Sequence, residues 1–171
     1  MERDAITIIE PHADDAFLSL HGHIKEWIKD GVDVCIVTLS GDTRRLQEAE
    51  RYALTQGCEW TDDRNRQARC AGETRVIVPL GIKHPDHIDA RLRFGKGDCW
   101  FYVDQPYALC QRDRCEVTTK LKGMEIVSFM KPHARKWRHL TIFESQKSYF
   151  SHFHRADAFK PAAFEMVVRK A

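Results

Sequence analysis

Two short polar clusters in this sequence contain side chains of the kinds that bind metal ions and transfer protons. The first cluster is residues 11–15, Pro-His-Ala-Asp-Asp, and the second is residues 84–87, His-Pro-Asp-His. Each cluster comes shortly after an apolar, β-branched run, residues 5–9 and residues 74–80, that is typical of a buried strand. Because open α/β sheets bind ligands beyond the carboxyl ends of their strands, we expect the two clusters to converge at one sheet edge.

One carboxylate and two imidazoles in these clusters suffice for a metal site. His12 and Asp15 are three residues apart in the first cluster, and His87 comes from the second. Together they supply three ligands and leave a fourth position for water, which is the pattern of a catalytic rather than a structural zinc site. A metal ion held there would lower the pKa of its water to about 7 and polarise a substrate carbonyl.

The remaining polar side chains of the clusters suit the other roles in a hydrolytic reaction. Asp14 stands beside a predicted ligand, where it can act as a general base. His84 precedes His87 by three residues, so it can face the same pocket and stabilise a developing oxyanion. Asp86 can hold one of the histidines in the tautomer that a metal ion requires.

Each cluster also has a purely structural interpretation. Asp14 and Asp15 follow a strand, where carboxylates commonly cap the next helix. His84 and His87 alone are compatible with a surface turn. The appearance of both clusters after separate parallel strands favours a metal site, but the pattern by itself leaves both interpretations open.

The elements around the first cluster predict an α/β fold. Residues 5–9 and 32–39 read as strands, and residues 16–29 between them carry apolar side chains at helical spacing. A strand, a helix and a second strand form a β-α-β unit, which requires parallel strands and a right-handed crossover. No Gly-x-Gly-x-x-Gly follows the first strand, so a dinucleotide is not indicated.

The rest of the chain adds elements to the same sheet. We expect strands at residues 74–80, 98–103 and 164–169, helices at 44–56 and 134–149, a loop or short helix at 58–72 and a short edge strand at 115–120. Residues 123–130 are apolar and fit either a helix or a strand. With no repeat or linker in view, we expect a single α/β domain over residues 1–171.

Composition and charge narrow the classes of function. The chain has 171 residues and a formal net charge of only +2, so we expect neither nucleic acid nor a membrane surface as its partner. The absence of a long apolar run predicts no signal peptide and no membrane helix, and we expect a cytoplasmic protein. The six cysteines contain no C-x-x-C pair and are expected to be free thiols, although a zinc site from Cys110, Cys115 and a histidine stays open.

The two clusters also resemble a known family. Residues 12–15, His-Ala-Asp-Asp, resemble the His-Pro-Asp-Asp-Glu signature of the zinc-dependent N-acetyl-sugar deacetylases of the PIG-L/LmbE-like family. Residues 84–87 match the family's second motif, His-x-Asp-His. Weaker matches follow the family's order along the chain: Gly22, Ile24, Arg45, Glu48, Gly57, Lys136, Ser145 and Gln146.

The resemblance implies a Rossmann-like three-layer sandwich and hydrolysis of an N-acetyl group from an amino sugar or glycoconjugate. The roles it implies are Zn2+ ligands at His12, Asp15 and His87, a general base at Asp14, an oxyanion stabiliser at His84 and a substrate contact at Arg45. Fe2+ is the alternative metal. A small N-acetylated molecule is the expected partner, and a homo-oligomer stays open.

The sequence departs from the family pattern at single positions and in a shortened region between the helix of Arg45 and His84, and Ala16 and this shortening support a competing hypothesis. Ala13 replaces a proline, Ala16 replaces a glutamate, and His21 stands where the family has a glycine. One alternative is that the His21 side chain narrows the pocket, but we expect it to face solvent or to pack inside. The alternative is a catalytically inactive relative that binds a sugar or a metal, and a metal-dependent phosphoesterase is less well supported because carboxylates for a second metal are missing.

Overall fold

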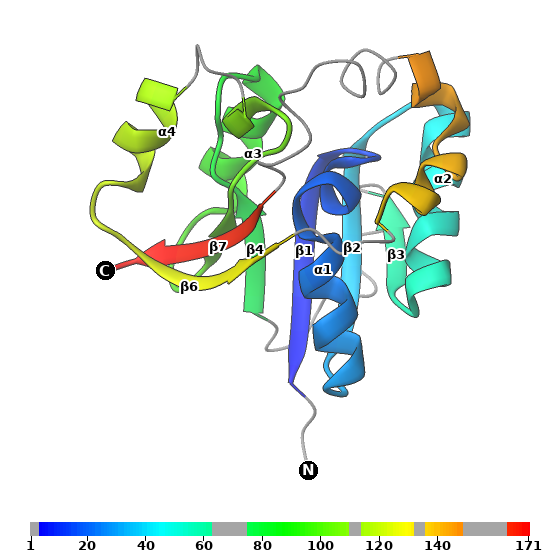
Figure 1. The fold of residues 1–171 in the computed structure, drawn as a ribbon, viewed down its shortest axis with the longest axis horizontal. Helices are drawn as coiled ribbons and strands as arrows, with labels where there is room; N and C mark the ends of the chain where they lie inside the picture. The colour runs from blue at the N-terminus through cyan, green and yellow to red at the C-terminus, as the bar shows by residue number, and fades with distance from the viewer. Residues whose placement is uncertain (1–3, 63–74, 110–113, 132–135, 149–163) are drawn as a thin grey trace.

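The computed structural model describes residues 4–62, 75–109, 114–131, 136–148 and 164–171. Within these ranges the chain forms a seven-stranded sheet between layers of helices (Figure 1). The strands are β1 (Ala5–His12), β2 (Asp33–Ser40), β3 (Glu59–Asp62), β4 (Arg75–Pro79), β5 (Trp100–Tyr102), β6 (Met124–Met130) and β7 (Glu165–Lys170). Their order across the sheet is β3-β2-β1-β4-β5-β7-β6.

Five of the strands run parallel and place their carboxyl ends at one edge. β1 pairs in parallel with β2 on one side and with β4 on the other, and β3 and β5 continue the parallel sheet outward. β7 then pairs antiparallel with β5, and β6 pairs antiparallel with β7. The predicted mostly parallel sheet is therefore confirmed.

Helices cover both faces of the sheet. They are α1 (Asp15–Lys29), α2 (Thr43–Gln56), α3 (Pro85–Phe94) and α4 (Arg114–Leu121), with 3-10 turns η2 (Tyr107–Leu109), η4 (Lys136–Thr141) and η5 (Glu144–Gln146). Phe17 of α1 and Tyr52 of α2 share one buried apolar cluster with Ile8 of β1. Ala90 of α3 belongs to a second cluster with Ile9, the next residue of β1. Successive strand residues point to opposite faces, so the two clusters are the two interfaces of a three-layer sandwich, as expected.

Local sequence signals set the helix ends near the site. The Asp42 side chain caps α2 by accepting a hydrogen bond of 2.9 Å from the Arg45 backbone N–H. Gly57 ends the same helix with φ of 83°, a conformation that side chains with a Cβ rarely adopt. The cap on α2 fixes the position of Arg45, which stands in the first turn of that helix.

The edge strand expected at residues 115–120 is instead part of helix α4. The β-branched residues there favour a strand locally. Val117 and Leu121, however, are one helical turn apart, and both pack against the second apolar cluster. An ion pair of 3.7 Å between Glu116 and Lys120 adds a contact at the same helical spacing. Packing at a helical period therefore overrides the local preference.

Three other segments refine the sequence predictions. Residues 59–62, expected in a loop or short helix, form β3 alongside β2. The ambiguous residues 123–130 form strand β6. The helix expected over residues 134–149 is replaced, where the structure describes it, by the 3-10 turns η4 and η5.

The membrane and cysteine predictions are tested only where the structure describes the chain. Within the described ranges, every helix is too short or too polar to span a lipid bilayer. The described cysteines, Cys35, Cys58, Cys99 and Cys115, are free thiols. Cys70 and Cys110 lie outside the described residues, and so the thiols there and the zinc site proposed around Cys110 remain predictions.

Candidate metal centre and catalytic cleft

The first cluster lies at the junction of β1 and α1. His12 is the last residue of β1, and Asp15 is the first residue of α1. The Asp15 Oδ2 atom accepts a hydrogen bond of 2.7 Å from the His12 backbone N–H, which folds the carboxylate back toward the histidine. Asp14 occupies the N-cap position, but its side chain makes no capping hydrogen bond. The helix-cap interpretation of this carboxylate is therefore wrong.

The second cluster forms the start of α3. His84 is the N-cap residue, and its Nδ1 atom accepts a hydrogen bond of 3.2 Å from the Asp86 backbone N–H. Pro85 follows at the first helical position, where its missing N–H costs nothing. His87 then lies in the first turn and is fully buried, so the surface-turn interpretation is wrong for this histidine.

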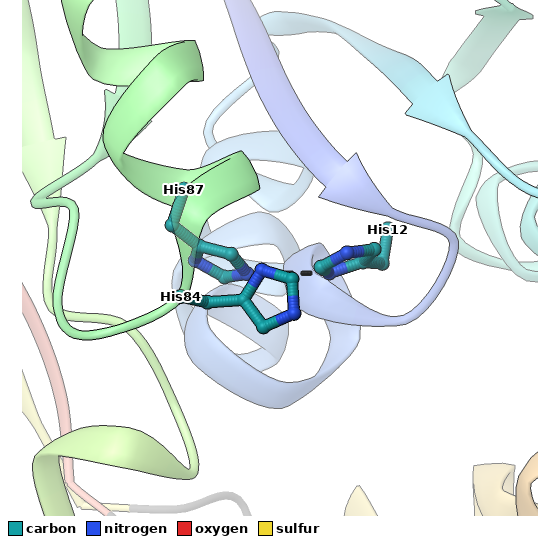
Figure 2. A group of neighbouring side chains, drawn as sticks. All are labelled: His12, His84 and His87. Atoms are coloured by element: carbon teal, nitrogen blue, oxygen red, sulfur yellow. Dashed lines mark hydrogen bonds between the residues drawn. The ribbon is translucent and has the colours of Figure 1, made fainter.

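Side chains from the two clusters meet at the junction of β1 and β4. Figure 2 shows His12, His84 and His87 turned toward one another, and these three histidines form a group that could hold a metal ion. The His12 Nδ1, Asp15 Oδ2 and His87 Nε2 atoms lie 3.3 Å from one another in all three pairs. A tetrahedral zinc ion with ligands at about 2.0 to 2.1 Å spaces its ligand atoms about 3.3 Å apart. The three atoms therefore fit zinc, and His84 stands beside them.

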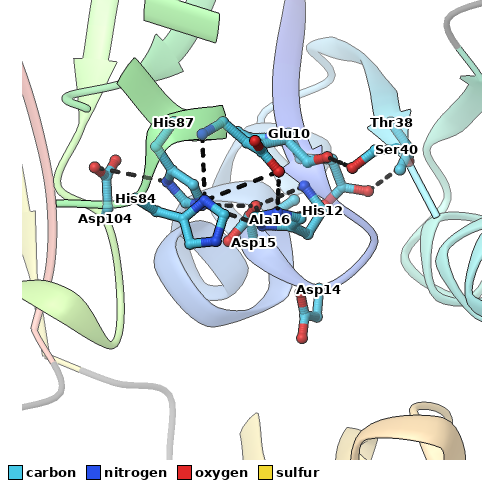
Figure 3. Close-up of polar contacts among 12 residues, drawn as sticks. Glu10, His12, Asp14, Asp15, Ala16, Thr38, Ser40, His84, His87 and Asp104 are labelled. Atoms are coloured by element: carbon cyan, nitrogen blue, oxygen red, sulfur yellow. Dashed lines mark hydrogen bonds and ion pairs between the residues drawn. The ribbon is translucent and has the colours of Figure 1, made fainter. Parts of the chain in front are cut away.

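The other ring nitrogens of the two predicted ligand histidines face carboxylates. His12 Nε2 lies 2.9 Å from Asp86 Oδ2, and His87 Nδ1 lies 3.6 Å from Asp104 Oδ2. Figure 3 shows Asp104 behind His87, on the side away from His12. Carboxylates in such positions orient a histidine toward a metal ion. Asp86 thus contacts His12, and its role in setting the tautomer of that ring stays a prediction.

The electrostatics of the cluster favour a cation. Burial alone would lower the pKa of His87, but the nearby carboxylates of Asp15 and Asp104 raise it to about 10. Burial opposes the ionisation of Asp15, yet the charge of His87 and the hydrogen bond with His12 hold its pKa well below the usual range. The buried negative charge of Asp15 is thus stabilised by positive charge on its neighbours.

Asp14 points away from the metal-binding atoms. In Figure 3 its carboxylate turns from the cluster, and its Oδ1 atom lies 3.4 Å from the Arg45 guanidinium. Burial and the negative charge of Asp15 raise the pKa of Asp14 to about 6, and the positive charge of Arg45 opposes this shift. A carboxylate with such a pKa can both take and return a proton near neutral pH.

An open cleft of about 350 Å³ gives access to these groups. Its lining includes residues from both clusters and from four other segments: His12, Asp14, Asp15, Leu18, Arg45, His84, Pro106, Tyr107 and Gln146. A volume at the lower end of the usual range for small-molecule sites suits one ring with its substituents. Ala13 and Ala16 are both buried and are not among the residues that line the cleft.

Two acidic residues near the site, Asp104 and Glu10, were not predicted from the sequence. Asp104 directly follows the strand predicted at residues 98–103, which is the same position relative to a strand that identified the first cluster. Glu10 lies inside β1, where its carboxylate accepts hydrogen bonds from the Ala16 backbone N–H and the Thr38 hydroxyl. Burial raises the pKa of Glu10 to about 8. A polar residue within an apolar strand was the available signal for Glu10.

Three of the residues that match the family less specifically stabilise the walls of the cleft: Glu48, Lys136 and Ser145. The Glu48 carboxylate of α2 accepts hydrogen bonds from the Ser145 backbone N–H and hydroxyl, at 2.9 and 2.5 Å. This pair fastens η5, and with it Gln146, beside the cleft. Lys136 donates to the Leu18 carbonyl at 2.6 Å and to Glu165 at 2.8 Å, both inside the protein. These residues position the site rather than line its reactive centre.

His21, which stands where the family has a glycine, lies inside the protein. His21 is fully buried, and its Nδ1 atom lies 2.9 Å from the Tyr52 hydroxyl. It therefore packs inside and leaves the cleft unobstructed. Two further histidines, His152 and His154, which fit either extra metal ligands or loop residues, lie outside the described residues.

Solved structures with a similar fold include several deacetylases. The A40926 pseudoaglycone deacetylase Dbv21 matches with a TM-score of 0.63 and 17% sequence identity, over 99% of this chain and 97% of that protein. The zinc-inhibited form of the teicoplanin deacetylase Orf2 matches with a TM-score of 0.62 and 15% identity, over 97% of this chain and 98% of that protein. At such identities the likeness establishes the fold, and it confirms the Rossmann-like fold that the resemblance implies.

The same fold also occurs in a protein of different activity. GalB, the 4-carboxy-2-hydroxymuconate hydratase from Pseudomonas putida KT2440, matches with a TM-score of 0.59 and 14% identity, over 89% of this chain and 83% of that protein. No protein-family model matches the chain, and neither does any curated protein. Because one fold supports both reactions, the activity must be argued from the site.

Proposed function

We propose that this chain is a PIG-L/LmbE-like hydrolase that removes the N-acetyl group of an amino sugar or glycoconjugate with the help of a metal ion. The observation that carries the proposal is the set of three donor atoms, each 3.3 Å from the other two, beside a buried carboxylate in an open cleft. The deacetylases that share the fold support this choice of reaction.

His12, Asp15 and His87 would hold the metal ion, and zinc is the first candidate. The donor set of two imidazoles and one carboxylate matches that of catalytic zinc sites, and Fe2+ is the alternative for the same donors. A zinc ion so held would activate a water molecule near neutral pH and polarise the acetyl carbonyl. The zinc-inhibited form of the teicoplanin deacetylase indicates that zinc can bind to a protein of this fold.

Asp14 would be the general base that accepts a proton and later returns it. Its carboxylate lines the cleft and turns from the three donor atoms instead of being one of them. Its oxygens can therefore take a proton from the attacking water. As the carbon–nitrogen bond of the amide breaks, Asp14 returns that proton to the leaving nitrogen. The products are acetate and a free amine. The Arg45 guanidinium holds Asp14 from the cleft side and is placed to contact the substrate as well.

His84 would stabilise the negative charge that develops on the carbonyl oxygen. Its Nδ1 atom accepts the Asp86 N–H, so the ring proton of the neutral histidine is on Nε2. Burial and the positive charge of His12 lower the pKa of His84, which favours this neutral form. A neutral donor at the cleft wall can bond to the oxyanion without competing for the metal ion.

Substitution of the base tests the proposal most directly. Asp14→Asn removes the proton acceptor but none of the three donor atoms, so we expect acetate release to fall by about 100- to 10,000-fold. The bound zinc should stay at the level of the unsubstituted protein. Acetate release from N-acetylglucosamine-type compounds and elemental analysis of the purified protein measure the two quantities.

A matched control is Asp89→Asn, which changes an exposed carboxylate on α3. It should leave both acetate release and zinc content unchanged. Zinc-bound Asp14→Asn protein with full turnover would contradict the assigned base. A purified protein that binds no metal and stays inactive after zinc is added would contradict the proposed function as a whole.

A further inference from the structure

A buried carboxylate and a buried imidazole face each other behind the candidate metal site. Asp104, the second residue after β5, and His87 are both completely inaccessible to solvent. His87 Nδ1 lies 3.6 Å from Asp104 Oδ2, slightly beyond hydrogen-bond length. Among the described residues, neither His87 Nδ1 nor Asp104 Oδ1 has a hydrogen-bond partner. Such unsatisfied buried atoms are costly, so a pair that faces each other calls for an explanation.

The backbone nitrogen of Ile82 and the ring nitrogen Nδ1 of His87 both lie near the same Asp104 oxygen, Oδ2. The Ile82 backbone N–H, in the loop between β4 and α3, donates a short hydrogen bond to Oδ2. This bond ties the segment after β5 to the loop that ends at His84 and leads into α3, the helix that carries His87. A small approach of His87 would let its Nδ1–H bond to the same carboxylate. An ionised carboxylate can accept both bonds, because each of its oxygens has two lone pairs.

We propose that Asp104 is a positioning residue that holds the proton of His87 on Nδ1 and so leaves Nε2 unprotonated for the metal ion. The inference rests on the proposed function, because it assigns His87 Nε2 to the metal site. Nε2 is the atom that lies 3.3 Å from both His12 and Asp15. A histidine that carries its only proton on Nε2 cannot bind a metal ion through that atom.

The substitution Asp104→Asn keeps the size of the side chain but removes its negative charge. The variant can still accept the Ile82 N–H through an amide oxygen at the Oδ2 position, which keeps the loop in place. Because Oδ2 is also the atom that lies 3.6 Å from His87 Nδ1, the same amide oxygen faces the ring as a neutral acceptor. A neutral acceptor bonds to the Nδ1 proton less strongly than a carboxylate does, so it holds the ring less firmly with Nε2 toward the metal site. We therefore expect the metal-free variant to keep its fold but to bind zinc more weakly.

Zinc affinity and metal-free stability together test this inference. For Asp104→Asn we expect the zinc dissociation constant, measured by competition with a chromophoric chelator, to rise about 10- to 100-fold. The melting temperature of the metal-free variant should match that of the unsubstituted protein. Asp98→Asn, an exposed change before β5, is the matched control and should alter neither quantity.

The outcomes separate this inference from the function on which it rests. An Asp104→Asn protein that binds zinc as tightly as the unsubstituted protein would overturn the role of Asp104 and leave the proposed function standing. A variant that loses zinc affinity and metal-free stability together would show a merely structural role and also overturn it. An unsubstituted protein that binds no zinc would overturn both.

A second measurement needs no substitution and therefore does not depend on the folding of a variant. In the zinc-loaded protein, the His87 ring should show a proton on Nδ1 in nitrogen-15 NMR spectra, protected from exchange by burial and by Asp104. A His87 ring whose Nδ1 is bound to zinc or carries no proton would overturn the inference.

Discussion

Each of the three histidines at the site uses one ring nitrogen for a protein contact and keeps the other for chemistry. His12 Nε2 contacts Asp86, and His84 Nδ1 accepts the Asp86 backbone N–H. His87 Nδ1 faces Asp104. These contacts leave Nδ1 of His12 for the site, whereas in His84 and His87 they leave Nε2. Three residues of one type can therefore supply two metal ligands and one hydrogen-bond donor, because the partner of each ring decides its role.

A fourth histidine, His21, makes folding sensitive to acid. Burial lowers the pKa of His21 to about 3, against the opposing negative charge of Glu165, whereas the unfolded chain binds that proton near the ordinary value of 6.5. The pKa is thus lower in the folded state, so the stability it contributes is complete above pH 6.5. That contribution is lost as the pH falls from about 6.5 toward 3, by at most about 1.4 kcal/mol per pH unit.

His21→Phe should flatten this pH dependence, since the ring then no longer titrates. The comparison is the urea midpoint at pH 7 and pH 5 for both proteins. The unsubstituted protein should lose more stability between the two values than the variant, whatever the variant's absolute stability. Equal losses would show that His21 does not titrate on unfolding.

At the scale of elements, a buried ion pair holds α1 against the sheet. Lys136 of η4 bonds to Glu165 of β7 at 2.8 Å and to the Leu18 carbonyl of α1. The second Glu165 oxygen accepts the Gly22 N–H at 2.6 Å, and a Cβ at Gly22 would lie only 3.0 Å from that oxygen. Burial opposes the ionisation of Glu165, but the charge of Lys136 lowers its pKa to about 2. The pair thus joins three segments distant in sequence.

Removal of the Lys136 cation alone should strongly destabilise the folded protein. Lys136→Met leaves the Glu165 carboxylate buried without its partner, so we expect the free energy of unfolding to fall by about 3 to 5 kcal/mol. Adding Glu165→Gln removes the stranded charge, and the double variant should be more stable than Lys136→Met alone. Urea unfolding of the single and double variants measures the coupling. A double variant less stable than Lys136→Met would contradict the explanation.

The same elements show which parts of the fold and site follow from sequence. Repetitive patterns predict β1, α1 and β2 well, and the strand-end positions of the two clusters predict that His12 and His87 meet. β3 has only four residues, too few for a period to emerge. Glu165 and Lys136 find each other only through tertiary packing, so their pairing has no local signal. After its strand Asp104 is followed by Gln105 and Pro106, so no second acidic or histidine side chain marked it as part of a cluster.

At the scale of the whole molecule, the site lies at the point where the strand order reverses, between β1 and β4. β1 lies between β2 and β4, and the helices that follow β1 and β4 pack on opposite faces. The crevice between these helices is the usual ligand site of such sheets. Asp15 comes from α1 and His87 from α3. A metal ion at the donor atoms would therefore link the two outer layers through the sheet edge.

Metal binding should consequently stabilise the whole fold. A ligand that binds only the folded protein adds about 2.7 kcal/mol at a concentration 100 times its dissociation constant. We expect the melting temperature to rise with zinc concentration in the unsubstituted protein and to stay constant after Asp15→Asn. Thermal denaturation across a zinc titration measures this, with magnesium as a control ion. An equal rise in the Asp15→Asn protein would place the zinc elsewhere.

In the cleft, the donor atoms and the outer wall residues come from different kinds of element. This difference indicates how the substrate range of such a protein can change. The donor atoms come from β1, α1 and α3, whereas Tyr107 and Gln146 on the walls come from short turns outside the core helices. Turns tolerate sequence change better than packed helices do. Mutations at those two positions can therefore alter which molecule is accepted while the reaction itself is kept. For enzyme engineering, Tyr107 and Gln146 are the positions to randomise first.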